Sequence, residues 1–209
     1  MIALIGPRGW IVAEAGEIAI AASAPGVIGG AVIKAARRSA GLSRRNLASA
    51  MAVDLATVRD WESGVRPLFC VSYHELCQLA QVLERAGARV GHKVDELVLA
   101  SQCDLLITGM LRGFEDYAEV PNVNEDVAGD AARSLLRWAL IGQVPERYRP
   151  YAQMGRLVTE RDASLFANVA RDLQEGSHGD DIARYGTALI ALITPRVPDS
   201  ARGDTYTKE

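Results

Sequence analysis

The apolar positions of this chain recur at intervals of three and four residues, the spacing that places them on one face of an α-helix. Between residues 26 and 90 these stripes are short. Each ends at a glycine or begins after a residue that caps helices. The capping and terminating residues are Gly41, Ser43, Asp54, Gly64, Ser72 and Gly87. The pattern therefore predicts four short helices, over residues 26–40, 43–51, 55–63 and 72–86.

The second half of the chain shows the same periodicity in longer segments. The predicted helices cover residues 94–111, 124–141, 159–175 and 180–193. Asn124 is the expected cap of the second of these, and Thr159 or Asp162 begins the third. No sustained alternation of polar and apolar residues is present, so the predicted fold class is all-α. The sequence of residues 1–25 is compatible with three structures: a small hairpin, a disordered arm and a loosely docked helix.

Charge separates the segment of short helices from the rest of the chain. Residues 30–90 carry nine basic and five acidic side chains, a formal charge of +4, whereas residues 91–209 carry −6. Residues 1–29 carry −1. One small segment is therefore suited to a polyanion, and we expect the contact to be local rather than spread over the molecule.

Residues 43–51 and 55–63 form two short helices joined by a tight turn, the pattern of a helix-turn-helix. Leu47 and Val58 are expected to face the core from the two helices. Ala48 is small at the point where they cross, and a larger side chain there would push them apart. The fold class is therefore refined to an N-terminal helix-turn-helix domain of four to five short helices, followed by a helical C-terminal domain.

The order of residues over about 28–87 resembles the lambda-repressor/Cro-type (XRE) helix-turn-helix family. The matching elements are Arg37, Gly41-Leu42-Ser43, Leu47-Ala48, Ala52-Val53, Trp61-Glu62-Ser63-Gly64, Pro67 and Leu76-Cys77-Gln78-Leu79-Ala80. The chain departs from that pattern at three places. Ala52 stands at the turn glycine, Arg44 stands where glutamine is usual, and the loop after Pro67 is longer. An alanine in the left-handed conformation of this turn costs about 1–2 kcal/mol.

The resemblance implies that residues 55–63 are a recognition helix that enters the major groove of double-stranded DNA by its N-terminal end. Because Val58 and Trp61 point inward, four other side chains are expected to reach base edges. These are Leu55, Ala56, Arg59 and Asp60. Arg59 is the expected principal reader, since a guanidinium matches guanine O6 and N7. Asp60 has three possible roles: accepting from a cytosine amine, orienting Arg59, or a purely structural one.

Four flanking residues are expected to contact phosphates. They are Arg44, Arg45, Thr57 and Arg66. For Arg45 and Arg66 the alternative is an ordinary solvated charge, and for the whole helix pair it is a protein-binding hairpin. Arg37 and Glu62 are expected to form an ion pair that ties the first helix to the end of the recognition helix.

Other kinds of site find little support in the sequence. Cys70, His74 and Cys77 have a spacing that can gather metal ligands, but apart from His92 no fourth ligand is near, so we expect no metal and no cofactor. A self-cleaving serine–lysine domain needs a base, and no lysine occurs between Lys93 and Lys208. We therefore predict a protein that is not an enzyme.

The three cysteines, with no export signal and no membrane span, favour free thiols and a cytoplasmic location.

The expected organisation is an arm over 1–27, a DNA-binding domain over 28–90, a dimerisation or partner-binding domain over 91–195 and a flexible tail over 196–209. The expected function is sequence-specific regulation of transcription, as a repressor acting as a homodimer. The alternative is an antitoxin or adaptor whose C-terminal helices bind a partner protein.

Overall fold

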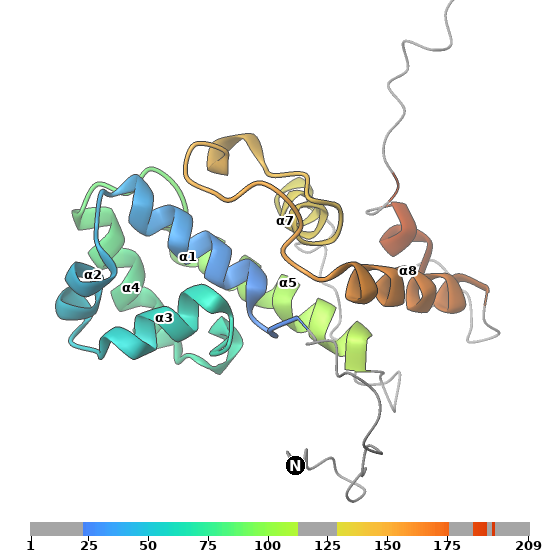
Figure 1. Ribbon diagram of the computed structural model, residues 1–209, viewed down its shortest axis with the longest axis horizontal. Helices are drawn as coiled ribbons and strands as arrows, with labels where there is room; N and C mark the ends of the chain where they lie inside the picture. The colour runs from blue at the N-terminus through green and yellow to red at the C-terminus, as the bar shows by residue number, and fades with distance from the viewer. Residues whose placement is uncertain (1–22, 113–128, 176–185, 192–193, 195–209) are drawn as a thin grey trace, which may run out of the picture.

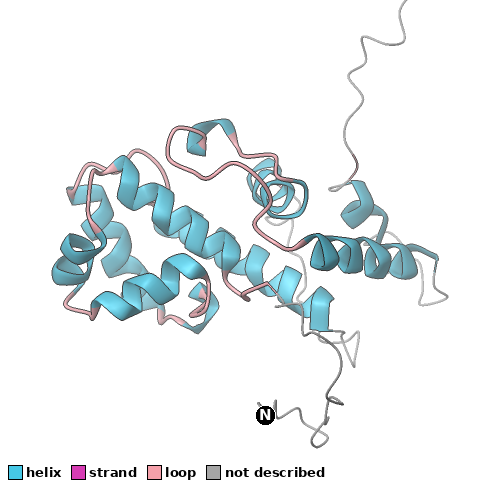
Figure 2. Ribbon diagram, in the orientation of Figure 1, coloured by secondary structure: helices cyan, strands magenta, loops and turns pink. Residues whose placement is uncertain are grey.

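The computed structural model describes residues 23–112, 129–175, 186–191 and 194. The described residues form helices joined by loops and contain no strand, which confirms the all-α prediction (Figures 1 and 2). The main elements are α1 (Val27–Ser39), α2 (Arg44–Met51), α3 (Leu55–Ser63), η1 (Leu68–Cys70), α4 (Tyr73–Arg85), α5 (Val94–Arg112), α7 (Asp130–Ile141), η3 (Glu146–Tyr148) and α8 (Glu160–Glu175). Residues 186–191 are also helical. The expectations for residues 1–22, Asn124, residues 180–185 and 192–193 of the last predicted helix, and the tail lie outside the described residues.

The four short helices begin and end where their sequence signals place them. Ser43 Oγ accepts a hydrogen bond from the Asn46 amide at 3.0 Å, so it caps α2. At the start of α4, Ser72 and Glu75 form a reciprocal capping box. Asp54 occupies the cap position of α3, but its side chain makes no capping hydrogen bond.

The turn between α2 and α3 has the left-handed conformation expected from the sequence. Ala52 has φ 53° and ψ 40°, and it is the one non-glycine residue with positive φ among those described. The amide of the next residue, Val53, donates to the Ala48 carbonyl at 3.0 Å. The chain therefore reverses within three residues and brings α3 against α2, which it contacts.

The longer loop after Pro67 is anchored rather than loose. It contains the single turn η1, in which Leu68 is 1 % exposed and packs against α5.

The close approach of α1 to the end of α3 depends on Gly30. A Cβ atom there would lie 2.6 Å from the Trp61 carbonyl oxygen, so a larger residue would push the two helices apart.

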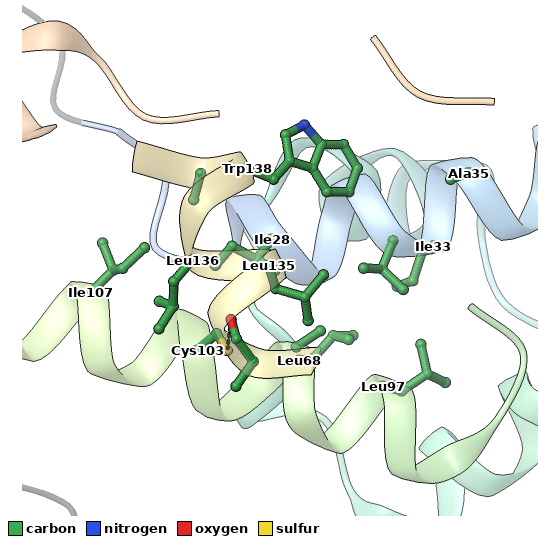
Figure 3. Packing of buried hydrophobic residues seen from close by; sticks show 14 of the residues in the cluster. Ile28, Ile33, Ala35, Leu68, Leu97, Cys103, Ile107, Leu135, Leu136 and Trp138 are labelled. Atoms are coloured by element: carbon green, nitrogen blue, oxygen red, sulfur yellow. Dashed lines mark hydrogen bonds between the residues drawn. The ribbon is translucent and has the colours of Figure 1, made fainter. Parts of the chain in front are cut away.

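Helix α5 lies alongside α1 and also contacts η1, α4, α7 and α8 (Figure 1). Its buried residues, among them Leu97, Cys103 and Ile107, join a hydrophobic core that includes Ile28 of α1 and Leu135 of α7 (Figure 3). The core is therefore continuous across residue 90, where the sequence divides into two expected domains. α7 has many apolar residues, and they are buried because α1 and α5 of the same chain pack against this helix.

The N-terminus of α1 receives its cap from α5. Gly26 supplies no side chain there, and both oxygens of the Asp104 carboxylate accept backbone hydrogen bonds at 2.8 Å, from Ile28 and Gly29. Asp104 is fully buried. Burial raises the pKa of its carboxyl to about 7, although the two amide hydrogen bonds act in the opposite direction.

Two further polar connections join distant segments. The Tyr148 hydroxyl donates to Glu96 of α5, while Arg147 contacts Glu96 at 3.0 Å and Trp138 stacks on the Tyr148 ring. Ser23, which precedes α1, forms hydrogen bonds with residues at the start of α8. Its amide donates to Asp162 at 2.7 Å, and its hydroxyl also contacts the Asp162 carboxylate.

The Ser23 hydroxyl oxygen also accepts the Thr159 amide at 2.8 Å. Thr159 Oγ1 accepts the Asp162 amide at 3.1 Å, which confirms Thr159 as the residue that begins α8. Among the helices in the described part of the chain, none is long and apolar enough to cross a membrane.

Candidate nucleic-acid interface

The packing of α3 divides its residues into an inner and an outer face. Val58 is fully buried and Trp61 is 2 % exposed, as predicted. On the outer face, Ala56, Arg59 and Asp60 are exposed. The remaining two predicted contact residues of this helix, Leu55 and Thr57, are half-buried.

A shallow hollow of about 430 Å³ lies between the N-terminal ends of α2 and α3. The residues that line it are Ser43, Arg44, Arg45, Asn46, Leu55 and Arg59. It therefore brings the predicted principal reader, Arg59, beside two of the predicted phosphate contacts. Asn46 was not singled out in the sequence, although its position on the outward face of α2 beside Arg45 was a usable signal.

Glu62, at the end of α3, joins three helices through one buried carboxylate. Arg37 of α1 donates to both of its oxygens, and Arg44 Nε of α2 donates to Oε2 at 2.6 Å. The predicted Arg37–Glu62 ion pair is therefore confirmed. Burial opposes the charged form of Glu62, but the hydrogen bonds from the two arginines outweigh it, so the pKa of the carboxyl lies below its usual value.

Arg44 thus has a structural partner that the sequence did not reveal. Its side chain is 44 % exposed, so it also keeps a solvent-facing surface at the rim of the hollow. The assignment of Arg44 to a phosphate stays a prediction. In the geometry described, one face of its guanidinium orients α2 against α3 and another remains open to an anion.

Arg66 follows α3 and is held by two weak contacts. Its guanidinium lies 6.0 Å from the centre of the Trp61 ring and 4.0 Å from the Glu75 carboxylate. Its side chain is 43 % exposed.

Of the eight predicted site residues, four line the hollow: Arg44, Arg45, Leu55 and Arg59. Ala56, Thr57 and Asp60 lie elsewhere on α3, and Arg66 lies beyond its C-terminal end.

The thiols and imidazoles of the described residues do not gather into a site. No group of three or more His, Cys, Asp or Glu residues there is arranged to hold a metal ion. Cys103 is fully buried, and burial raises the pKa of its thiol to about 12, which leaves it in the unreactive protonated form. What the α2–α3 surface offers chemically is binding: three arginines in an open hollow, on a rigid pair of helices.

Comparison with known proteins finds no matching family model, no matching curated protein and no matching solved structure.

Proposed function

We propose that this protein binds double-stranded DNA in a sequence-specific manner and regulates transcription, with α3 as the recognition helix. The observation that carries the proposal is the hollow at the N-terminal ends of α2 and α3, where Arg44, Arg45 and Arg59 meet. A helix that enters the major groove presents its N-terminal residues to base edges, and cations on the preceding helix then meet the phosphates.

The electrostatics of this surface favour the same ligand. Two of its three arginines have no carboxylate partner among the described residues, because Glu62 pairs with Arg44 and not with Arg45 or Arg59. Exposed guanidinium groups that are not already paired with a carboxylate can form charge-assisted hydrogen bonds to phosphate, and such contacts release counterions from DNA. We further propose that the protein acts as a homodimeric repressor, so that two recognition helices lie about one turn of DNA apart.

The test is selection of bound sequences from random double-stranded DNA with the full chain, followed by binding measurements on the selected site. Arg59→Ala should relax the preference at one base position by about 1–3 kcal/mol. Arg171→Ala, which removes an exposed arginine of α8, is the matched control and should leave both affinity and preference unchanged. An Arg59→Ala protein with undiminished preference would show that Arg59 is not the reader.

Arg45→Ala separates anchoring from reading. It should weaken all DNA sequences by a similar factor and reduce the slope of log affinity against log salt by about one. A selected site with two-fold symmetry would support the homodimer, and a single asymmetric half-site would contradict it. If no sequence is enriched at all, the proposed function fails.

A further inference from the structure

Two aspartates lie on the surface of α3 that would face DNA under the proposed function. Asp54 immediately precedes the helix and Asp60 lies on its outer face, and both residues are exposed. A carboxylate that approaches the phosphates of DNA is repelled by them. Each aspartate therefore weakens DNA binding unless it makes a favourable contact of its own.

Asp54 makes no contact within the described part of the chain that explains its presence. Aspartate is a strong N-cap because its carboxylate accepts a hydrogen bond from an amide in the first turn of the helix. The backbone of Asp54 has the extended conformation of a cap, with φ −69° and ψ 151°, but its side chain accepts no such hydrogen bond. It also forms no ion pair with any described residue. The carboxylate is therefore left facing solvent at the end of α3 that would enter the groove.

The side chain of Asp60 is also unpaired, although its backbone takes part in the fold. Its carbonyl oxygen accepts hydrogen bonds from the Arg66 amide at 3.1 Å and from the Ser63 hydroxyl at 3.2 Å. Its carboxylate forms no ion pair among the residues that the structure describes, so it neither orients Arg59 nor ties α3 to another helix there. Of the three roles considered from the sequence, acceptance from a cytosine amine is the one that this geometry favours.

The chemistry of a carboxylate restricts the base edge that it can meet. An ionised carboxylate only accepts hydrogen bonds. In the major groove cytosine presents its N4 amine without a neighbouring acceptor, whereas adenine presents its N6 amine beside the acceptor N7. Guanine and thymine present acceptors, which would repel a carboxylate. Cytosine is therefore the base that attracts a carboxylate without also repelling it.

The spacing of the two aspartates limits how far apart their contacts on DNA can be. They are six positions apart, and a helix rises 1.5 Å per residue, so they are separated by about 9 Å along the axis of α3. Successive base pairs are about 3.4 Å apart. The two carboxylates therefore span at most two to three base-pair steps. Arg59, which is suited to guanine, is adjacent to Asp60 in the sequence.

We propose that Asp54 and Asp60 are specificity-determining residues that accept hydrogen bonds from cytosine N4 amines, so that the DNA selected by this protein carries G·C pairs where α3 meets it. This inference rests on the proposed function. The same carboxylates oppose binding to sites without those amines, where their repulsion from phosphates and base acceptors is not offset. Arg44 and Arg45 on α2 supply general affinity, and the aspartates restrict it to the correct sequence.

The test is selection from random double-stranded DNA with the full chain and with Asp54→Asn and Asp60→Asn. Asparagine has almost the same shape as aspartate and caps helices equally well, so both variants should fold. The unchanged protein should select cytosines at two positions no more than three base pairs apart. Each variant should lose about five- to 150-fold of the cytosine preference at one of them. Asp172→Asn is the matched control, because it removes an exposed aspartate of α8, at the opposite end of the molecule from α2 (Figure 1).

Double-mutant cycles assign each aspartate to its base. Affinities are measured for the selected site and for sites in which one C·G pair is replaced by T·A, with each protein. Asp54→Asn should couple to one of the two positions and Asp60→Asn to the other. Each variant should also bind DNA of unrelated sequence about two- to fivefold more tightly at low salt, because one repulsive charge is removed.

The outcomes separate this inference from the proposed function. An enriched site without cytosine near the position that Arg59→Ala relaxes overturns the inference and leaves the proposed function standing. A cytosine preference that survives both aspartate variants, or that Asp172→Asn reduces equally, also overturns the inference alone. If no sequence is enriched, both fail.

Discussion

Ala52 holds the turn of the helix-turn-helix in a conformation that glycine adopts at lower cost. Its left-handed backbone brings Cβ close to the following carbonyl oxygen, at a cost of about 1–2 kcal/mol, and its exposed methyl group gains little from packing. The turn nevertheless forms, because Met51 before it is buried and Val53 after it is partly buried against the core.

Ala52→Gly should therefore stabilise the protein by about 0.5–1 kcal/mol. The relief of strain exceeds the extra backbone entropy that glycine loses on folding. The measurement is urea unfolding, with a higher midpoint and an unchanged slope. Ala50→Gly is the matched control, since Ala50 is also exposed but helical, and it should destabilise by about 1 kcal/mol. Equal destabilisation by both substitutions would mean that Ala52 is not strained.

At the candidate site, the sequence predicts which face of α3 a side chain occupies, but it does not predict every contact between helices. Val58, Trp61 and Arg59 were assigned to the correct faces of α3, because helical periodicity fixes inner and outer positions. The pairing of Arg44 with Glu62 was missed. The two residues are 18 positions apart on different helices, and only the crossing of α2 and α3 brings them together.

At the scale of helices, the elements whose signals are local were the predictable ones. α2 and α4 carry their own caps in Ser43 and Ser72, and both helices begin there. α1 ends just before the predicted Gly41, but its N-terminal cap is Asp104, 76 positions away on α5, and no local signal indicates that residue. The apolar pattern of α5 predicted its length but not which helices it covers, since a stripe of buried residues does not identify its partner.

The buried cap makes stability depend on pH. Burial raises the pKa of Asp104 from 3.8 to about 7, so the folded protein holds this proton more tightly than the unfolded chain does. The stabilising contribution is complete below about pH 4. It is lost as the pH rises toward 7, with a slope of up to about 1.4 kcal/mol per pH unit.

Asp104→Asn should remove that dependence. The check is urea unfolding between pH 4.5 and 7.5, where the stability of the unchanged protein minus that of the variant should fall as the pH rises. Asp95→Asn, an exposed change on the same helix, should follow the unchanged protein in parallel. If the curve for Asp104→Asn also runs parallel, Asp104 does not titrate in this range.

At the scale of the molecule, one hydrophobic core serves both the proposed DNA-binding segment and the C-terminal helices. α5 covers Leu68 and Ile28 and supplies the cap of α1, so residues 28–90 have an apolar face that they cannot bury alone. Charge and the extent of the motif predict a domain boundary near residue 90. Neither of these reports on packing.

A fragment ending at residue 90 should therefore show no cooperative thermal transition by circular dichroism, because it loses the apolar cover that α5 provides. A fragment ending at residue 112, which retains α5, is the control and should regain a transition. A cooperative melt of the shorter fragment near the melting temperature of the full chain would establish residues 28–90 as an independent domain.

The hydrogen bonds between Ser23 and Asp162 have a consequence for folding during synthesis. The two residues are 139 positions apart, so α1 to α7 leave the ribosome before the partner of Ser23 exists. Closing so long a loop carries an entropic cost that local contacts do not, and such contacts form late in folding. The nascent chain therefore passes through a stage in which the helix-turn-helix segment is already synthesised while its N-terminal attachment is still open.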